Sequence, residues 1–157
     1  MTTAEKLVKR LTELGKTCGT AESCTGGGVG SAITSVSGSS AVFMGGVISY
    51  DNSVKRNVLG VSSETLATVG AVSPETAEQM ALGAQKLLSV DYAVSVTGIA
   101  GPGGGSAEKP VGLVWFGIAT PVGVKTESIT LPGDRDTVRA AAVEHALFLL
   151  LSAPDGQ

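Results

Sequence analysis

Two glycine-rich segments carry residues that could do chemistry. Residues 21–28 read AESCTGGG, and residues 97–106 read TGIAGPGGGS. Where a glycine turn leads into a helix, unpaired backbone N–H groups and the positive end of the helix dipole can bind a phosphate without a basic side chain. Ser23 and Thr25 would add hydroxyl donors. Alternatively, these residues cap the helix and the glycines serve close packing.

The second segment follows a run of residues that we expect to form a central strand. Because glycine lacks a Cβ atom, the backbone of this loop can approach a ligand and present amides to an oxyanion or a ribose phosphate. A mobile surface connection is the alternative interpretation. The first segment is neither a P-loop nor a dinucleotide-binding fingerprint, because no lysine follows its glycines and the G-x-G-x-x-G spacing is absent.

A third segment, residues 38–55, contains Ser39, Ser40, Tyr50 and Lys55. A hydroxyl nucleophile needs a base, and the candidates are a lysine, a tyrosine or a carboxylate. Lys55 could serve only if burial or a neighbouring cation lowers its pKa, and an exposed surface lysine is the alternative. Taken alone, Ser39 and Ser40 are typical turn residues.

Other reactive side chains have simpler interpretations. Cys24 is a competing nucleophile, since a thiol near a helix N-terminus can be acidified, and it would need the single histidine, His145, as its base. His145 falls on an apolar helical face, where a packed histidine is more common. Glu22 and Asp134 lie near loops, but nothing in their spacing pairs them. Arg135 could meet an anionic ligand or point into solvent.

Composition excludes several classes of function. The 157 residues carry a net charge of −3 and no cluster of Lys or Arg, so the chain lacks the basic face that nucleic acid requires. No apolar run approaches the roughly 18 residues of a membrane helix, and charged residues interrupt the N-terminus where a signal peptide would be apolar. We therefore expect a cytoplasmic protein that contacts no membrane. Two cysteines and one histidine are a poor basis for a zinc site, and no metal is expected.

The hydrophobic pattern predicts the elements that would position these segments. Expected strands cover residues 16–21, 43–50, 91–97, 111–120 and 124–131, the last two joined as a hairpin. Helices are expected before and between the strands, with a first helix ending at Gly15, another beginning at Ser73 and Pro74, and a last one capped by Asp134. This order predicts an α/β fold, three-layer α/β/α with a mixed central sheet. We expect one domain over residues 1–157, with a disordered tail at 153–157.

Motifs along nearly the whole chain, from about residue 6 to 151, resemble the CinA C-terminal domain family. They comprise residues 21–27 (AESCTGG), 38–40 (GSS), Tyr50 with Lys55, 70–73 (GAVS), 97–104 (TGIAGPGG), 109–112 (KPVG) and 133–135 (GDR). Many family members carry an additional N-terminal domain similar to molybdopterin-cofactor proteins. This sequence resembles the stand-alone form.

The resemblance implies a nicotinamide-nucleotide amidase, which converts nicotinamide mononucleotide to nicotinic acid mononucleotide and ammonia in pyridine nucleotide recycling, without a metal or cofactor. It implies that Ser40 attacks the carboxamide, that Lys55 and Tyr50 move its proton, and that Ser23 is the second choice of nucleophile. Backbone N–H groups near Ser40 or Gly98 would hold the oxyanion. Expected substrate-binding residues are Glu22, Thr25, Gly26, Gly27, Thr97, Gly98, Gly101 and Arg135.

A second class of function stays open at this point. Some family members are linked to competence or DNA-damage responses, so the domain could sense a nucleotide or bind a partner protein without turnover. A phosphoryl-transfer enzyme is disfavoured, because the sequence shows neither a P-loop nor an evident pair of Mg²⁺-binding carboxylates. The expected partner is a small-molecule nucleotide, and the high apolar content suggests a homo-oligomer.

Overall fold

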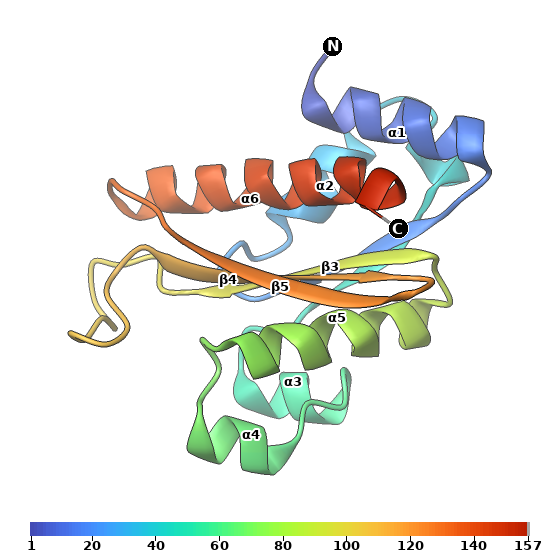
Figure 1. Cartoon of the computed structure of the whole chain (residues 1–157). Helices are drawn as coiled ribbons and strands as arrows, with labels where there is room; N and C mark the ends of the chain where they lie inside the picture. Colours follow the sequence, from blue (N-terminus) through green and yellow to red (C-terminus); the bar gives the residue numbers. More distant parts are fainter. Residues whose placement is uncertain (157) are drawn as a thin grey trace.

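The computed structural model describes residues 1–156 and shows helices on both faces of a five-stranded sheet (Figure 1). The helices are α1 (Thr3–Leu14), α2 (Gly28–Thr34), α3 (Asn52–Asn57), α4 (Ser63–Thr68), α5 (Pro74–Leu88) and α6 (Arg135–Ser152), with short 3₁₀ helices η1 (Ser39–Ala41) and η2 (Ala153–Gly156). The strands are β1 (Cys18–Glu22), β2 (Phe43–Ile48), β3 (Tyr92–Gly98), β4 (Leu113–Thr120) and β5 (Gly123–Thr130).

The sheet is mixed, as predicted, and its strand order is β2-β1-β3-β4-β5. Strands β2, β1 and β3 are parallel, whereas β4 and β5 form an antiparallel hairpin beside β3. Parallel strands end at the same edge of a sheet, so the segments that follow β1, β2 and β3 meet there. The β1–β2 pairing contains a register irregularity between Cys18 and Gly19, after which Glu22 pairs with Ile48 at that edge.

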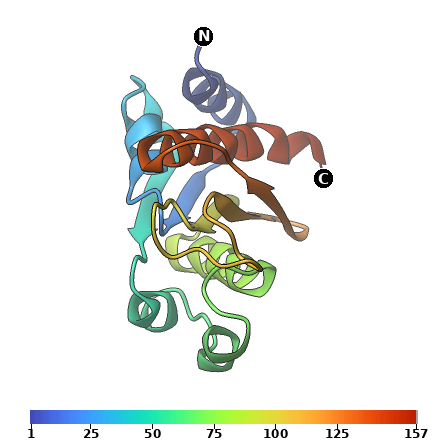
Figure 2. The same cartoon turned by 90° about the vertical axis from the view of Figure 1, so that its left-hand side faces the viewer.

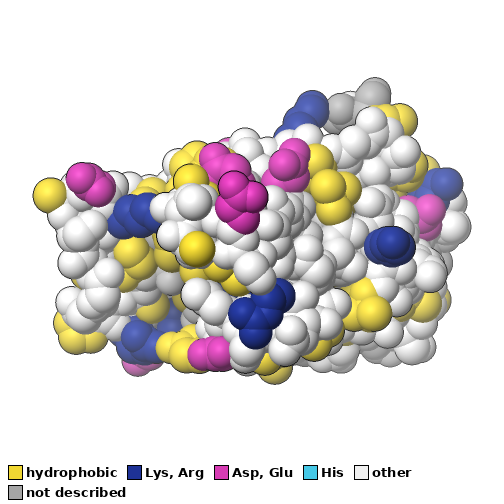
Figure 3. Space-filling view, turned by 90° about the horizontal axis from the view of Figure 1, so that it is seen from below, with side chains coloured by type: hydrophobic (Ala, Val, Ile, Leu, Met, Phe, Trp, Pro, Cys, Tyr) yellow, Lys and Arg dark blue, Asp and Glu magenta, His cyan; other side chains and the backbone are white. Residues whose placement is uncertain are grey.

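Helices α1, α2 and α6 cover one face of the sheet, and α3, α4 and α5 lie on the other, which gives the three predicted layers (Figures 1 and 2). Each face has its own apolar cluster. Alternate residues of β3 pack into the two clusters: Val94 and Val96 belong to the cluster on the α6 side, and Ala93 belongs to the cluster on the α5 side. This double burial matches the prediction of a covered central strand. On the face formed by α3, α4 and α5, Lys and Arg side chains are dispersed, with Asp and Glu side chains and uncharged surface between them (Figure 3).

Helix caps explain why most boundaries were predictable. Ser73 accepts from the N–H of Thr76, and Asp134 accepts from that of Thr137, so α5 and α6 begin where expected. Helix α4 was not predicted. It has no buried residue, so its sequence lacks the apolar stripe that would reveal it.

The C-terminal residues were expected to be disordered, but residues 153–156 are helical in the structure. Residues 153–156 form η2, where Ala153 is buried and Asp155 pairs with Arg10 of α1. The apolar contact and the ion pair hold the segment against the domain. The final residue of the predicted tail, Gln157, lies outside the described residues. Within residues 1–156, no helix has both the length and the apolar character needed to cross a bilayer.

Candidate functional site

A buried lysine contacts a buried serine where β1 and β2 end. Lys55 belongs to α3, a short helix that Asp51 caps, and its side chain is 1% exposed. Its Nζ atom lies 3.1 Å from the Oγ atom of Ser23, which directly follows β1. The same nitrogen lies 2.7 Å from the carbonyl oxygen of Ser49 and 3.2 Å from that of Tyr50, after β2. The parallel pairing of β1 and β2 thus brings residues 32 positions apart into contact.

The partners of Lys55 define what the pair can do. Carbonyl oxygens only accept hydrogen bonds, so Ser49 and Tyr50 each take one hydrogen from the amine. A protonated Lys55 donates its third hydrogen to Ser23, whereas a neutral amine keeps a lone pair that can accept the Ser23 hydroxyl proton. Burial lowers the pKa of Lys55, although Asp51 and Cys24 act in the opposite direction. The geometry is that of a nucleophile beside its base.

A cavity of about 220 Å³ opens over this pair at the carboxyl edge of the parallel strands. Its walls include predicted residues from all the glycine-rich and polar segments, namely Ser23, Tyr50, Lys55, Thr97, Gly98 and Arg135. These side chains come from positions spread over more than a hundred residues of sequence. The fold therefore assembles one polar cavity from segments that were predicted separately.

Ser40 lies away from this cavity. It is an exposed residue of η1, which precedes β2, whereas Lys55 follows β2. The six residues of β2 separate the two ends by about 20 Å, at roughly 3.3 Å per residue. The expected pairing of Ser40 with Lys55 and Tyr50 therefore does not occur within the chain.

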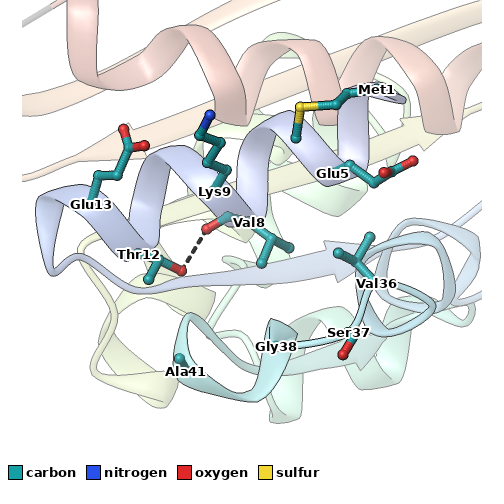
Figure 4. A pocket seen from close by; sticks show the side chains of 10 residues that line it. All are labelled: Met1, Glu5, Val8, Lys9, Thr12, Glu13, Val36, Ser37, Gly38 and Ala41. Carbon is teal, nitrogen blue, oxygen red and sulfur yellow. Dashed lines mark hydrogen bonds between the residues drawn. The ribbon is translucent and has the colours of Figure 1, made fainter.

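A hollow lined by Gly38 and Ala41, on either side of Ser39 and Ser40 in the sequence, offers no comparable pair. It lies between α1 and residues 36–41, and Figure 4 shows the side chains that line it. Its lysine, Lys9, is exposed, and the Thr12 hydroxyl donates to the Val8 carbonyl of its own helix at 2.7 Å. A hydroxyl nucleophile at this place would lack a buried base.

The carboxylate of Glu22 occupies the position at which we expected a phosphate. It is 2% exposed and accepts from the N–H groups of Val29 and Gly30, at 2.8 and 3.0 Å, in the first turn of α2. Hydroxyl groups of Thr25, at 2.7 Å, and Thr20, at 3.3 Å, donate to the same carboxylate. An anion from the chain itself thus satisfies the start of this helix. Glu22 and Thr25 stabilise the turn and are absent from the cavity wall.

Gly26 and Gly27 have a conformational role in the same turn. Their φ angles are +59° and +98°, a region that residues with side chains rarely adopt. A Cβ atom on Gly27 would also lie 3.0 Å from the Cδ1 atom of Ile48. These glycines let the chain turn sharply from β1 into α2, and neither lines the cavity.

We expect Glu22→Gln to lower the free energy of unfolding by about 2–4 kcal/mol, because a buried amide has one acceptor oxygen for several donors and adds unpaired N–H groups. Urea denaturation at neutral pH measures this difference. The control is Glu64→Gln, an exposed residue in the first turn of α4, for which a change within about 0.5 kcal/mol is expected. Equal stability of the two variants would contradict the structural role of Glu22.

The second glycine-rich segment is held by contacts within the protein. The Thr97 hydroxyl is buried and donates to the carbonyl of Ala71 at 2.9 Å. A Cβ atom on Gly98 would lie 2.7 Å from the Cγ2 atom of Val114, so glycine is needed there for packing against β4. Gly101, with φ of +82°, does not line the cavity.

Arg135, the first residue of α6, connects the two sides of the cavity. Its guanidinium donates to the carbonyl of Gly101 at 2.8 Å and to the hydroxyl of Tyr50 at 3.3 Å. Tyr50 therefore contacts Lys55 through its backbone carbonyl, while its phenol faces Arg135. Both partners of Arg135 are neutral, and among the residues described it forms no ion pair. Its positive charge remains available to an anionic ligand.

Residues that shape this site and were not among the predicted site residues include Ser49 and Arg139. Ser49 supplies the nearest carbonyl to Lys55, and Arg139 of α6 donates to the backbone of the loop after Ser23. The signal for Arg139 was its spacing of four from Arg135, which places both on one face of a helix. Ser49 gave no signal, because any residue carries a carbonyl.

The alternative nucleophile, Cys24, lacks the base that it would need. Burial raises the pKa of its thiol to about 11. His145 lies 2.7 Å from a Glu127 carboxylate oxygen on β5, and its ring packs against Phe116. The proposed Cys24–His145 pair is therefore not assembled. Over residues 1–156, no three His, Cys, Asp or Glu side chains gather as metal ligands would.

Comparisons with known proteins agree with this architecture. Residues 1–153 match the model of the CinA C-terminal domain. A CinA-like protein of Leptospira borgpetersenii is 52% identical over 151 residues, which cover 93% of this chain and 35% of the relative. The chain thus spans about a third of the length of the curated relatives it matches.

Two solved structures share the fold over nearly their whole length. The competence/damage inducible protein CihA of Agrobacterium tumefaciens has a TM-score of 0.92 at 46% identity, covering 98% of this chain and 97% of that one. A CinA superfamily protein of Klebsiella pneumoniae has a TM-score of 0.94 at 34% identity, covering 99% and 97%. On these matches and on its motifs, the chain belongs to the CinA C-terminal domain family.

Proposed function

We propose that this chain is an amidase that hydrolyses the carboxamide of nicotinamide mononucleotide to nicotinic acid mononucleotide and ammonia. The observation that carries the proposal is the contact of 3.1 Å between the Ser23 hydroxyl and the buried amine of Lys55 at the floor of a polar cavity. A serine activated in this way can attack a carboxamide carbon. Family membership is consistent with this activity.

In the proposed reaction, neutral Lys55 accepts the Ser23 hydroxyl proton while Oγ forms a bond to the carboxamide carbon. The resulting ammonium of Lys55 gives that proton to the departing nitrogen, so ammonia leaves and an ester to Ser23 remains. Lys55 then takes a proton from water as the water attacks the ester. The bond between Ser23 Oγ and the carbon then breaks as Lys55 returns the proton to Oγ, so the carboxylic acid product leaves and both residues are back in their starting states.

A backbone amide beside the nucleophile is the proposed oxyanion donor. The N–H group of Cys24 directly follows Ser23 in a residue that lines the cavity, and within residues 1–156 it donates to no other residue. An amide fixed at this place can stabilise the negative oxygen of a tetrahedral intermediate. Of the positions considered from sequence, Gly98 also borders the cavity, whereas Ser40 does not.

The cavity has room for the carboxamide end of the substrate, and its rim supplies a charge for the phosphate. Its volume of about 220 Å³ is below the range of pockets that enclose a whole drug-sized ligand. Arg135 and Ala100 also border a second, open hollow of about 580 Å³ beside the start of α6. We propose that the nucleotide extends over Arg135 into this hollow.

We expect Arg135→Gln to raise the KM for nicotinamide mononucleotide about 10-fold or more, with a smaller effect on kcat, because a charged contact to the substrate phosphate is lost. Steady-state ammonia release measures both constants. Arg56→Gln, which removes an exposed arginine from α3, is the matched control and should retain the wild-type KM. A loss confined to kcat would argue against a phosphate contact.

We expect kcat/KM to rise with pH through the pKa of Lys55, since only the neutral amine can accept the proton of Ser23. Burial lowers this pKa, so the midpoint of the rise should lie below the ordinary lysine value. Stability should change in the same direction: between the folded and unfolded pKa values the unfolded chain binds more protons, so stability increases with pH. A pH profile that falls across the neutral to alkaline range would contradict Lys55 as the base.

The direct test is ammonia release from nicotinamide mononucleotide, with the acid product identified by mass spectrometry. Free nicotinamide, which has the carboxamide but no ribose phosphate, is the matched control substrate and should react much more slowly. Saturable binding of the nucleotide without turnover would overturn the amidase proposal and would indicate a nucleotide-sensing module.

A further inference from the structure

Arg139 binds the loop that carries the nucleophile. Its Nε atom donates to the carbonyl of Cys24 at 3.0 Å, and one of its terminal nitrogens donates to the carbonyl of Thr25 at 3.3 Å. The side chain is partly buried, and in the described part of the chain it forms no ion pair. The guanidinium is thus committed to two consecutive main-chain carbonyls directly after Ser23.

These contacts determine the orientation of the peptide planes. In a trans peptide, the carbonyl of one residue and the N–H of the next point in opposite directions. Because the carbonyl of Cys24 points toward α6, the N–H of Thr25 points away from that helix. The next plane is fixed as well, since the carbonyl of Thr25 contacts Arg139 and the N–H of Gly26 donates to the carbonyl of Ser23 at 3.0 Å.

The loop that Arg139 holds borders the reacting groups, because Ser23 and Cys24 both line the cavity. Helix α6 covers one face of the sheet, and α3, which carries Lys55, lies on the other (Figure 1). The opposite side of the loop is held independently, because the Thr25 hydroxyl donates to Glu22 at 2.7 Å. Arg139 and Glu22 therefore fix the backbone after the nucleophile from two directions.

We infer that Arg139 is a positioning residue: by holding the carbonyls of Cys24 and Thr25 it fixes the loop directly after Ser23, so that the N–H of Cys24, a residue that lines the cavity, is held beside the negative oxygen that forms when Ser23 attacks a carbonyl. This inference rests on the proposed function, because it assigns a supporting residue to the same site. Arg135 and Arg139 lie one helical turn apart on α6. In this proposal Arg135 binds the substrate and Arg139 holds the loop that follows the nucleophile.

The test compares Arg139→Gln and Arg139→Lys with the wild-type protein. We expect Arg139→Gln to lower kcat about 100-fold with little change in KM, as for loss of one oxyanion-hole donor. The kcat of Arg139→Lys should lie between those of the wild type and Arg139→Gln, since an ammonium lacks the planar fork with which a guanidinium binds two carbonyls. The pH midpoint assigned to Lys55 should stay unchanged, and guanidinium ion should restore part of the activity of Arg139→Ala. Arg56→Gln is the control.

A second measurement separates this inference from the amidase proposal. A fluorophosphonate forms a bond from Ser23 Oγ to phosphorus as fluoride leaves and the hydroxyl proton passes to Lys55, and the attacked phosphonyl group also carries an oxygen that becomes negative. Mass spectrometry locates and times this labelling. Slower labelling of Ser23 in Arg139→Gln supports the inference even if the wild type does not hydrolyse the nucleotide.

Three results would overturn the inference. They are equal labelling rates of wild type and Arg139→Gln, no labelling of wild-type Ser23, and an Arg139→Gln effect that is confined to KM or displaces the pH midpoint. A displaced midpoint would mean that Arg139 acts through the charge of Lys55 instead of through the backbone.

Discussion

Ser23→Ala is expected to lower kcat for ammonia release from nicotinamide mononucleotide by about 10⁴-fold or more, because the attacking oxygen is removed and no other hydroxyl lies within hydrogen-bonding distance of Lys55 in residues 1–156. Ser40→Ala should retain activity close to that of the wild type. Comparing the two variants is a strict test, because both lose the same hydroxyl group but only Ser23 contacts Lys55.

Binding distinguishes loss of chemistry from loss of the fold. Ser23→Ala should still bind the nucleotide product, since Arg135 and the cavity wall remain, and this can be measured by calorimetry. If Ser40→Ala were inactive and Ser23→Ala active, the proposed nucleophile would be wrong. The family-based expectation for Ser40 would then require a contact that this chain does not make by itself.

Lys55→Met is expected to lower kcat about 1,000-fold, because positioned general acid–base catalysis contributes this order of magnitude. Lys55→Arg should be similarly inactive although it keeps the positive charge, since arginine does not release its proton at accessible pH. The Ser23→Ala/Lys55→Met double variant should be no slower than Ser23→Ala alone, because the two residues act as one unit. Rapid-quench or steady-state ammonia assays provide the rates.

Each Lys55 variant requires a check of folding, because its amine also satisfies the carbonyls of Ser49 and Tyr50. Thermal unfolding of Lys55→Met and Lys55→Arg supplies that check. Wild-type activity in a folded Lys55→Arg protein would contradict a role as base and would leave Lys55 with an electrostatic or structural role only.

Local sequence signals were sufficient for most elements of the fold. Caps such as Ser73 and Asp134, and the apolar run of β3, depend on neighbouring residues, so they can be read from the sequence. Helix α4 escaped prediction because it buries no side chain. The order of the tail could not be predicted, because its contacts, including that of Asp155 with Arg10, are made to the opposite end of the chain.

The candidate site depended more strongly on tertiary structure. Ser40 is closer to Lys55 in sequence than Ser23 is, but one strand separates them, whereas parallel pairing brings Ser23 into contact. The glycine turn suggested a ligand phosphate at the start of α2, but in the structure a carboxylate anion of the chain occupies this position. The sequence could not show that this anion would be Glu22, since the carboxylate reaches the helix only after the chain has turned.

Strand β2 lies at the edge of the sheet, and the proposed reaction depends on where this edge strand is held. This strand is hydrogen-bonded on one side only, yet its pairing with β1 sets how far apart the nucleophile and its base lie. A shift of one residue in the pairing of β2 with β1 would move each side chain of β2 to the opposite face of the sheet, and it would move Lys55 away from Ser23. Substitutions within Phe43–Ile48 can therefore abolish the proposed amidase activity without contacting the substrate, because the pairing of β1 with β2 fixes the distance between Ser23 and Lys55.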